Sequence, residues 1–385
     1  MPAGERERAR LDLRYDALVI RVESEESGHL AWLEEFLTPQ FEVVAGVLPH
    51  RTVRLVADSD RYADTLRRGP DPGGDCLAAF VMDSHVVTLP LWRGIGEARV
   101  LREEEFGAFY AISADGSAVE IVTPEGNSSV RNALMRVVRE LAMAGVRRTG
   151  GLLLHAAAVA LAEQVMVIAG PKQAGKTTLL VHILGQSPAR FVANDRVVVS
   201  GPGPGATARG LPTIVKLRRE TADWFPGLRD RLLASPFHHR RTLAEARGRA
   251  AGVTATAPDG YWSLSPAQFC ALLGVDAIPS GRLGAALFPR MTRRPGTLAL
   301  RALRPEETEA ALADSEFPSH RDGGPGSAGV DPWTGGAAPL ADDPASARRR
   351  WREVANSVPG FVCELGAEAY RDPTSAQRLL DRVGA

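Results

Sequence analysis

The stretch GPKQAGKTT at residues 170–178 decides which fold this chain can adopt. It follows QVMVIA, which has the composition of a buried strand, and it precedes LLVHIL, which continues as a helix. Two glycines, a lysine and a threonine match the pattern G-x-x-x-x-G-K-[ST]. A strand, a glycine-rich turn and a helix in this order predict an α/β fold with a phosphate-binding loop.

Each position of this loop has a mechanical reason. Gly170 and Gly175 can adopt backbone angles closed to other residues, so successive N–H groups converge on phosphates. The helix that follows directs its positive end at the same point. We expect Lys176 to reach the β- and γ-phosphates and the Thr177 hydroxyl to bind Mg²⁺. The predicted nucleotide-binding residues are Gly170, Pro171, Lys172, Gln173, Ala174, Gly175, Lys176, Thr177 and Thr178. A simple glycine turn between a strand and a helix is the alternative interpretation.

A bound metal–nucleotide also needs an acidic group at the end of a neighbouring strand. RFVAND at residues 190–195 supplies Asp195, which can hold magnesium directly or through water. The alternative is a carboxylate that only caps a turn. Together the loop and Asp195 predict ATP with Mg²⁺. GTP is disfavoured because the chain has no N-K-x-D guanine motif.

The rest of the chain divides by composition. Residues 1–125 read as a smaller α+β domain, and residues 126–149 read as a helix that bridges the two halves. Residues 150–313 form the phosphate-loop domain. Residues 314–347, dense in Gly, Pro and Ala, are expected to be a flexible loop. Residues 348–385 read as a C-terminal helical segment.

Bulk composition excludes several classes of function. Of 385 residues, 44% are hydrophobic and 24% are charged, and the formal net charge is zero, which gives no basic field for nucleic acid. No apolar stretch approaches the roughly 20 residues that span a bilayer, so we expect no membrane partner and a cytoplasmic location. The cysteines have no metal-ligand spacing and are expected to be buried apolar residues. They are Cys76, Cys270 and Cys363.

Four segments resemble the C-terminal catalytic domain of bacterial HPr kinase/phosphorylase. They are LHAAAV at 154–159, the loop itself, FVANDRVVV at 191–199 and ARGLP at 208–212. The resemblance covers roughly residues 150–220. It implies a nucleotide core shared with phosphoenolpyruvate carboxykinase and phosphoryl transfer from a nucleotide to a hydroxyl group. HPr kinases assemble into hexamers, so the resemblance leaves room for a homo-oligomer.

The resemblance also implies roles for single residues. His155 stands where the family has a histidine near the transferred phosphate, with Ala156 in place of the glycine that follows. Asp195 matches the metal-associated aspartate. Arg209 and Gly210 match an Arg-Gly pair that lines the site. A histidine on so apolar a strand would otherwise be read as a core residue.

One departure concerns the family's general base. The aspartate that takes the proton from the acceptor in HPr kinase is Asn194 here, and an amide cannot act as a base. Asn194 could still orient an acceptor hydroxyl by hydrogen bonding. The family's glutamate before Arg-Gly is also missing. The HPr-specific reaction is therefore not expected, and the catalytic candidates are Asp195, His155, Lys176 and Asn194.

Several arginines are candidates to clamp phosphate or an acidic acceptor. We name Arg209, Arg290 and Arg293, while a solvated arginine cluster is the alternative for each. The same alternative holds for Arg240, Arg241, Arg294, His238 and His239.

The predicted function is an ATP-dependent kinase that phosphorylates a hydroxyl of a small molecule or peptide. General-base assistance is typically worth about 10²–10⁴-fold, so its loss would slow a kinase without necessarily silencing it. A nucleotide-binding regulatory or assembly module that has lost transfer is one alternative. A P-loop ATPase that only hydrolyses its nucleotide is another.

Overall fold

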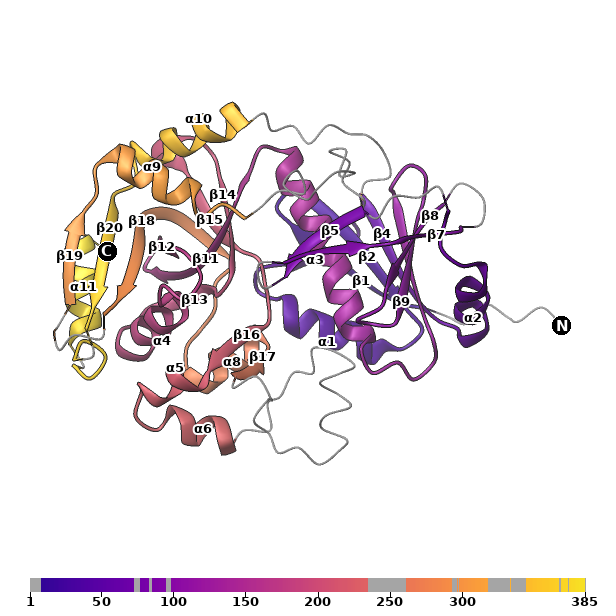
Figure 1. The fold of residues 1–385 in the computed structure, drawn as a ribbon, viewed down its shortest axis with the longest axis horizontal. Helices are drawn as coiled ribbons and strands as arrows, with labels where there is room; N and C mark the ends of the chain where they lie inside the picture. The colour runs from indigo at the N-terminus through magenta and orange to yellow at the C-terminus, as the bar shows by residue number, and fades with distance from the viewer. Residues whose placement is uncertain are drawn as a thin grey trace. The chain divides into compact units, whose positions relative to one another are not determined.

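The chain folds into two compact units of mixed α/β structure (Figure 1). The computed structural model describes residues 8–72, 77–82, 85–94, 98–234, 261–292, 296, 298–317, 333, 344–366, 368–372 and 374–384. The first unit holds the described residues up to Thr149 together with Trp333. The second unit holds the described residues from Gly150 to Phe317 and from Pro344 onward.

The first unit is built on an eight-stranded sheet of order β3-β1-β2-β4-β10-β9-β8-β7. Its three central strands β2, β4 and β10 run parallel, and the flanking strands pair antiparallel. The strands are β1 (Ala9–Tyr15), β2 (Leu18–Ser24), β3 (Glu42–Val43), β4 (Arg51–Ala57), β7 (Leu91–Trp92), β8 (Arg99–Glu103), β9 (Ala108–Ile112) and β10 (Ala118–Thr123), with a separate hairpin of β5 (Leu77–Met82) and β6 (His85–Leu89). The helices are α1 (Ser27–Leu37), α2 (Ser59–Arg68) and α3 (Val130–Arg148).

Helix α3 was expected to bridge the two halves, and the structure assigns it to the first unit. It contacts helix α1 and the parallel strands β2, β4 and β10. Most of its side chains are buried. Gly145 lies inside this helix, and a Cβ atom there would stand 3.2 Å from Leu18 Cδ2. The glycine therefore permits a close approach of the helix to the sheet.

The second unit is built on another eight-stranded sheet, which partly closes on itself. Its strands follow the order β12-β11-β14-β15-β18-β20-β19, and β13 pairs with β11. An additional pairing of β12 with β18 closes a ring of five strands: β12, β11, β14, β15 and β18. The strands are β11 (Leu152–Leu161), β12 (Gln164–Ala169), β13 (Arg190–Ala193), β14 (Arg196–Ser200), β15 (Thr207–Gly210), β18 (Ser280–Met291), β19 (Leu298–Ala302) and β20 (Gly360–Leu365), with a hairpin of β16 (Val215–Arg218) and β17 (Tyr261–Leu264).

Alternation along β11 divides the core of the second unit into two layers. Ala157 and Val159 pack in a cluster with helix α4 (Lys176–Gln186), whereas Ala156 and Ala158 belong to a cluster with Trp351 of α10 (Pro344–Ala355). The remaining helical elements are η1 (Gly203–Gly205), α5 (Arg219–Asp223), α6 (Leu228–Ala234), α8 (Pro266–Leu273), α9 (Pro305–Ala313) and α11 (Ser375–Val383). Helices thus cover both faces of the strands next to the loop of residues 170–175.

The C-terminal segment differs from the helical expectation. Helices α10 and α11 form as expected, but strand β20 lies between them and pairs parallel with β18 and antiparallel with β19. Residues 360–365 therefore belong to the same sheet as β12, the strand before the loop of residues 170–175. The expectation failed because FVCEL is short, and its pairing partner β18 lies about seventy residues earlier in the chain.

Part of the expected loop 314–347 is ordered against other elements. Phe317 donates its backbone N–H to Leu153 of β11, so the beginning of this stretch continues the sheet. Trp333 is fully buried in the first unit, with its ring centre 5.3 Å from that of Tyr110.

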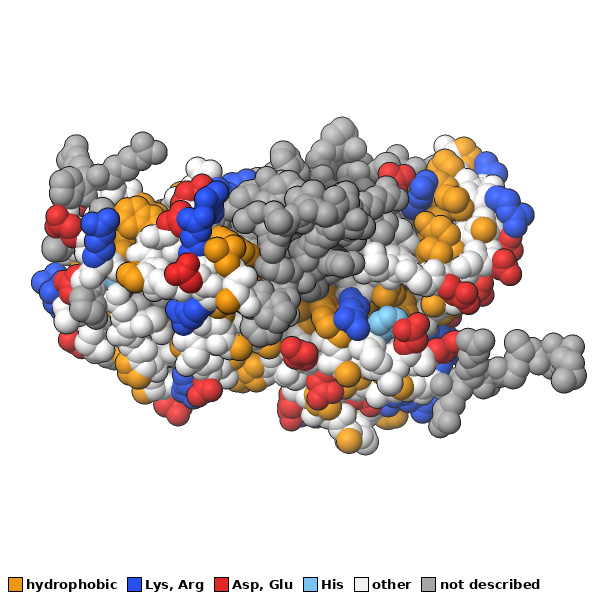
Figure 2. All heavy atoms as spheres, turned by 90° about the horizontal axis from the view of Figure 1, so that it is seen from below, with side chains coloured by type: hydrophobic (Ala, Val, Ile, Leu, Met, Phe, Trp, Pro, Cys, Tyr) orange, Lys and Arg blue, Asp and Glu red, His pale blue; other side chains and the backbone are white. Residues whose placement is uncertain are grey.

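The surface shows no concentration of one charge in the view of Figure 2, where basic and acidic side chains are interspersed. This distribution agrees with the net charge of zero. Within the residues described, no helix is both long and apolar enough to cross a membrane.

Candidate functional site

The loop of residues 170–175 joins β12 to α4, as the sequence predicts. Three of its residues have positive φ angles: Gly170 at 140°, Gln173 at 69° and Gly175 at 101°. Such angles strain residues with a side chain, so they are the physical reason for glycine at both ends of the loop. Gly175 is also the N-cap residue of α4. The backbone N–H groups of the first helical turn therefore begin directly where the loop ends.

Lys176 is the first residue of α4 and is 9% exposed. Its ammonium donates hydrogen bonds to the backbone oxygens of Gly170, at 2.8 Å, and Pro171, at 3.1 Å. Burial lowers the pKa of Lys176, and the charge of Asp195 acts against this shift. The lysine thus spans the loop, and Asp195 lies near enough to interact with it electrostatically.

Strand directions explain why Asp195 lies near the loop. Strand β11 pairs antiparallel with both β12 and β13, so β12 and β13 run the same way. Their carboxyl ends, which lead into the loop and into Asp195, therefore meet at one edge of the sheet. This is the edge where α/β sheets bind ligands.

His155 lies at the same edge. Its neighbour Ala156 pairs with Ala169, the last residue before the loop, and alternation places the His155 side chain on the α4 face with Ala157. His155 Nε2 lies 3.1 Å from Asp195 Oδ1, and the two side chains are 40% and 38% exposed. The core-histidine alternative is therefore excluded by the structure.

Arg196 holds the other side of Asp195. Its Nε atom lies 3.7 Å from Asp195 Oδ2, and its guanidinium carbon stands 4.3 Å from the ring centre of Phe317. The Arg196 side chain is only 7% exposed. The carboxylate of Asp195 is thus oriented by an imidazole on one oxygen and a buried cation near the other.

Asn194 is occupied by the protein itself. Its Oδ1 accepts a hydrogen bond from Thr213 Oγ1 at 3.0 Å, and its Nδ2 donates to the backbone oxygen of Ile214 at 3.3 Å. The residue is 8% exposed. This geometry makes Asn194 a clamp on residues 213–214, in contrast to the expectation that it orients an acceptor hydroxyl.

The described arginine candidates lie on two different strands. Arg209 lies on β15, opposite Val198 of β14, with a half-buried side chain. Arg290 is exposed near the end of β18, where alternation turns it to the opposite face from Met291. The other candidates on the basic stretches lie outside the described residues: Arg240, Arg241, Arg293, Arg294, His238 and His239.

Met291 is a neighbour of the loop that the sequence analysis missed. A Cβ atom at Gly175 would stand 2.6 Å from Met291 Cγ, so the methionine packs directly on the glycine. Strand β18 is parallel to β12, which brings its last residue to the edge of the loop. The apolar run ALFP before Met291 was the available signal for this strand, but its pairing could not be read from it.

The residues present fit a magnesium ion held largely by phosphates and water. Thr177, half-buried at the start of α4, and Asp195 offer oxygen ligands, which Mg²⁺ prefers. Among the described residues, no group of three or more His, Cys, Asp and Glu side chains could hold a metal ion alone.

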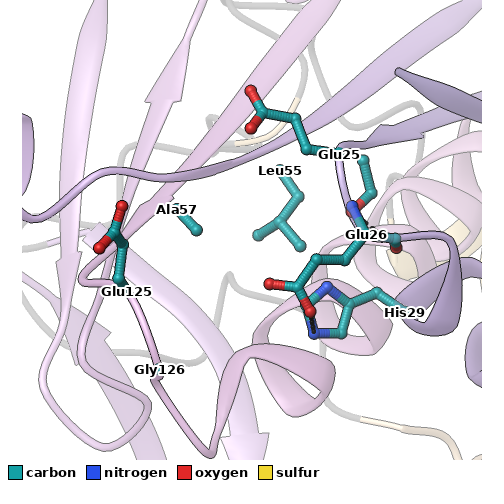
Figure 3. A pocket seen from close by; sticks show the side chains of 8 residues that line it. Glu25, Glu26, His29, Leu55, Ala57, Glu125 and Gly126 are labelled. Carbon is teal, nitrogen blue, oxygen red and sulfur yellow. Dashed lines mark hydrogen bonds and ion pairs between the residues drawn. The ribbon is translucent and has the colours of Figure 1, made fainter. Parts of the chain in front are cut away.

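A separate cavity of about 300 Å³ lies in the first unit, where the parallel strands β2 and β4 end (Figure 3). Glu25, Glu26 and Glu125 line it around an apolar floor that includes Leu55. Glu26 contacts His29 at 3.4 Å. None of the residues that line the cavity is a lysine or an arginine, and none belongs to the loop of residues 170–175.

No protein-family model matches this chain, and no curated protein matches it in sequence.

Cys270 and Cys363 are buried free thiols, as expected, and Cys76 lies outside the described residues.

Proposed function

We propose that the second unit binds ATP with Mg²⁺ at residues 170–178 and transfers the γ-phosphate to a hydroxyl group. The observation that carries this proposal is the loop between β12 and α4, with positive φ at Gly170 and Gly175 and with Lys176 at the helix start. An HPr-kinase-like nucleotide core is part of the same proposal. It is supported by the position of His155, Asp195 and Arg196 at the edge where the loop lies.

The loop residues bind the phosphates through backbone N–H groups and the positive end of α4. Lys176 exchanges its hydrogen bonds to Gly170 and Pro171 for bonds to phosphate oxygens. Thr177 and Asp195 would hold Mg²⁺, which when bound neutralises charge on the β- and γ-phosphates.

In the transfer step the acceptor oxygen forms a bond to the γ-phosphorus. The bond from that phosphorus to the β–γ bridging oxygen breaks, and ADP leaves. The acceptor proton passes to solvent by way of the partly exposed His155–Asp195 pair. Positioning and charge stabilisation supply most of the catalysis in such reactions, so a strong general base is not required.

One observation favours a second function, a nucleotide-binding module without transfer. Asn194 replaces the family's base and is sealed by Thr213 and Ile214, so no carboxylate stands at that position. In this case the loop would bind Mg–ATP and the bound state would act on a partner.

The deciding experiment uses ATP labelled at the γ-phosphate, Mg²⁺ and a small-molecule extract of cells, with and without the protein. Label in a new extract component supports the kinase, and free phosphate alone supports an ATPase. Calorimetric binding of Mg–ATP without turnover supports the module. Absence of binding at millimolar ATP would refute all three readings. Lys176→Ala is the control that should lose each activity.

A further inference from the structure

A nine-residue segment from Thr213 to Thr221 is tied to the candidate site at both ends. At its start, Thr213 and Ile214 are hydrogen-bonded by Asn194, the residue next to Asp195. At its end, Thr221 Oγ1 lies 3.3 Å from the hydroxyl of Thr178, in the first turn of α4. Thr213, Thr178 and Thr221 are each at most 7% exposed, so these ties are buried. Both ends of the segment are therefore fixed to residues at or next to the edge where the loop lies.

The outward side of this segment is basic. Val215 and Leu217 are fully buried in the core cluster that contains α4, so Lys216 and Arg218 alternate to the other face of β16. Lys216 is half-buried, with its ammonium 5.0 Å from the ring centre of Tyr261.

Arg219 follows Arg218 at the start of α5, and both are exposed. Neither guanidinium forms an ion pair with another described residue. The acidic side chain next to them in the chain is the exposed Glu220, so residues 216–220 carry an excess of positive charge.

The spacing places the first of these cations close to the residues that Asn194 holds. Lys216 lies two residues beyond Ile214, about 7 Å along an extended strand. In the proposed function the loop and Asp195 hold the nucleotide's own phosphates, which leaves these cations to attract a second anion. Arginine pairs with carboxylate or phosphate oxygens through two parallel hydrogen bonds.

We propose that Lys216, Arg218 and Arg219 form an acceptor rim that selects a hydroxyl compound carrying carboxylate or phosphate groups of its own. This inference rests on the proposed phosphotransfer function and adds the class of acceptor. Clustered cations also raise the local concentration of an anionic substrate, in a manner weakened by salt.

The test compares the double variant Arg218→Gln/Arg219→Gln with wild type. A cell extract of small molecules is separated on an anion exchanger into retained and unretained fractions, and each is incubated with γ-labelled ATP and Mg²⁺. We expect label only in the retained fraction. The variant should raise the KM for that fraction at least about tenfold, with the KM for ATP unchanged and kcat within about twofold.

Tricarballylate, a tricarboxylic acid without a hydroxyl group, should compete with the acceptor in the wild type and lose this effect in the variant. The matched control is Arg348→Gln/Arg349→Gln on α10, which removes two exposed arginines from the helix layer opposite α4. This control should behave as wild type in every assay.

Label that enters only the unretained fraction, or a variant with the wild-type KM for the acceptor, overturns the inference while Mg–ATP binding stays intact. Loss of Mg–ATP binding by the wild type in calorimetry overturns the proposed function itself, and this inference with it. The two failures are thus distinguished by one binding measurement.

Discussion

Replacing Asn194 with aspartate separates two views of the site. The resemblance to HPr kinases implies that an aspartate at this position would take the acceptor's proton, so on that view Asn194→Asp would supply a base and raise transfer. The structure leads to the opposite expectation. The Nδ2 group of Asn194 donates to the Ile214 carbonyl at 3.3 Å, and a carboxylate would place an acceptor against an acceptor.

The magnitude follows from these contacts. Losing the hydrogen bond to Ile214 costs about 1 kcal/mol. The new carboxyl group would be buried like the 8% exposed amide and would stand beside Asp195, which should raise its pKa by about two units. At about 1.4 kcal/mol per unit, ionisation at pH 7 adds nearly 3 kcal/mol. We expect Asn194→Asp to lower the free energy of unfolding by about 3–4 kcal/mol at pH 7.

The pH dependence of the stability difference between the Asn194→Asp variant and the wild type tests the sign of this expectation. A carboxyl group whose pKa is raised on folding costs nothing below its unfolded pKa of about 3.9, where it is protonated in both states. The difference between variant and wild type should therefore shrink toward about 1 kcal/mol as the pH falls from 7 to 4. Urea unfolding monitored by tryptophan fluorescence at several pH values measures this difference.

Transfer should fall in parallel, since residues 213–214 lose their clamp. Thr213→Val serves as a control that removes the partner of Oδ1 without adding a charge. A variant Asn194→Asp that is as stable as wild type and transfers phosphate faster would refute this reasoning and support the base interpretation.

Three further perturbations probe other parts of the second unit. Lys176→Ala should abolish calorimetric Mg–ATP binding. It should change the free energy of unfolding by no more than about 1 kcal/mol, because burial of the ammonium already opposes its two hydrogen bonds. A large loss of stability would show that the lysine is structural. Gly175→Ala should lower the free energy of unfolding by at least about 1 kcal/mol and weaken Mg–ATP binding, since φ is 101° and the new Cβ meets Met291. The double variant Gly175→Ala/Met291→Ala should regain only the stability lost to the clash with Met291. Full recovery of stability in urea unfolding would contradict the argument from backbone strain. Burial lowers the pKa of His182 to about 4, so as the pH falls the unfolded chain takes up this proton before the folded one does. The stability of the wild type should therefore fall by about 3 kcal/mol between pH 7 and pH 4. His182→Phe should flatten this fall, and an unchanged pH profile would rule out His182 as its source.

The local parts of the site could be predicted from the sequence. The loop, helix α4 and the strand before Asp195 form as expected because each depends on short-range signals, namely glycine angles, apolar runs and a helix start. Helix α8 likewise begins with Ser265 as its cap and Pro266 in its first turn, and it ends at Gly274 in a left-handed conformation.

The long-range parts could not be predicted in this way. The partners of Asn194 lie some twenty residues away, and nothing in NDRVVV indicates which backbone group an amide will meet. Met291 reaches Gly175 only because β18 pairs parallel with β12 more than one hundred residues earlier. Register between distant strands depends on the packing of whole layers, so these contacts required the structure.

The insertion of β20 between β18 and β19 bears on how the protein is made. During synthesis the ribosome releases the loop of residues 170–175 long before residues 360–365 emerge. Until then the edges of β18 and β19 that pair with β20 have no neighbour. A chain interrupted after α9 would carry every nucleotide-contacting residue proposed above and still lack a finished scaffold. Premature termination should thus yield an aggregation-prone product in place of a smaller working domain.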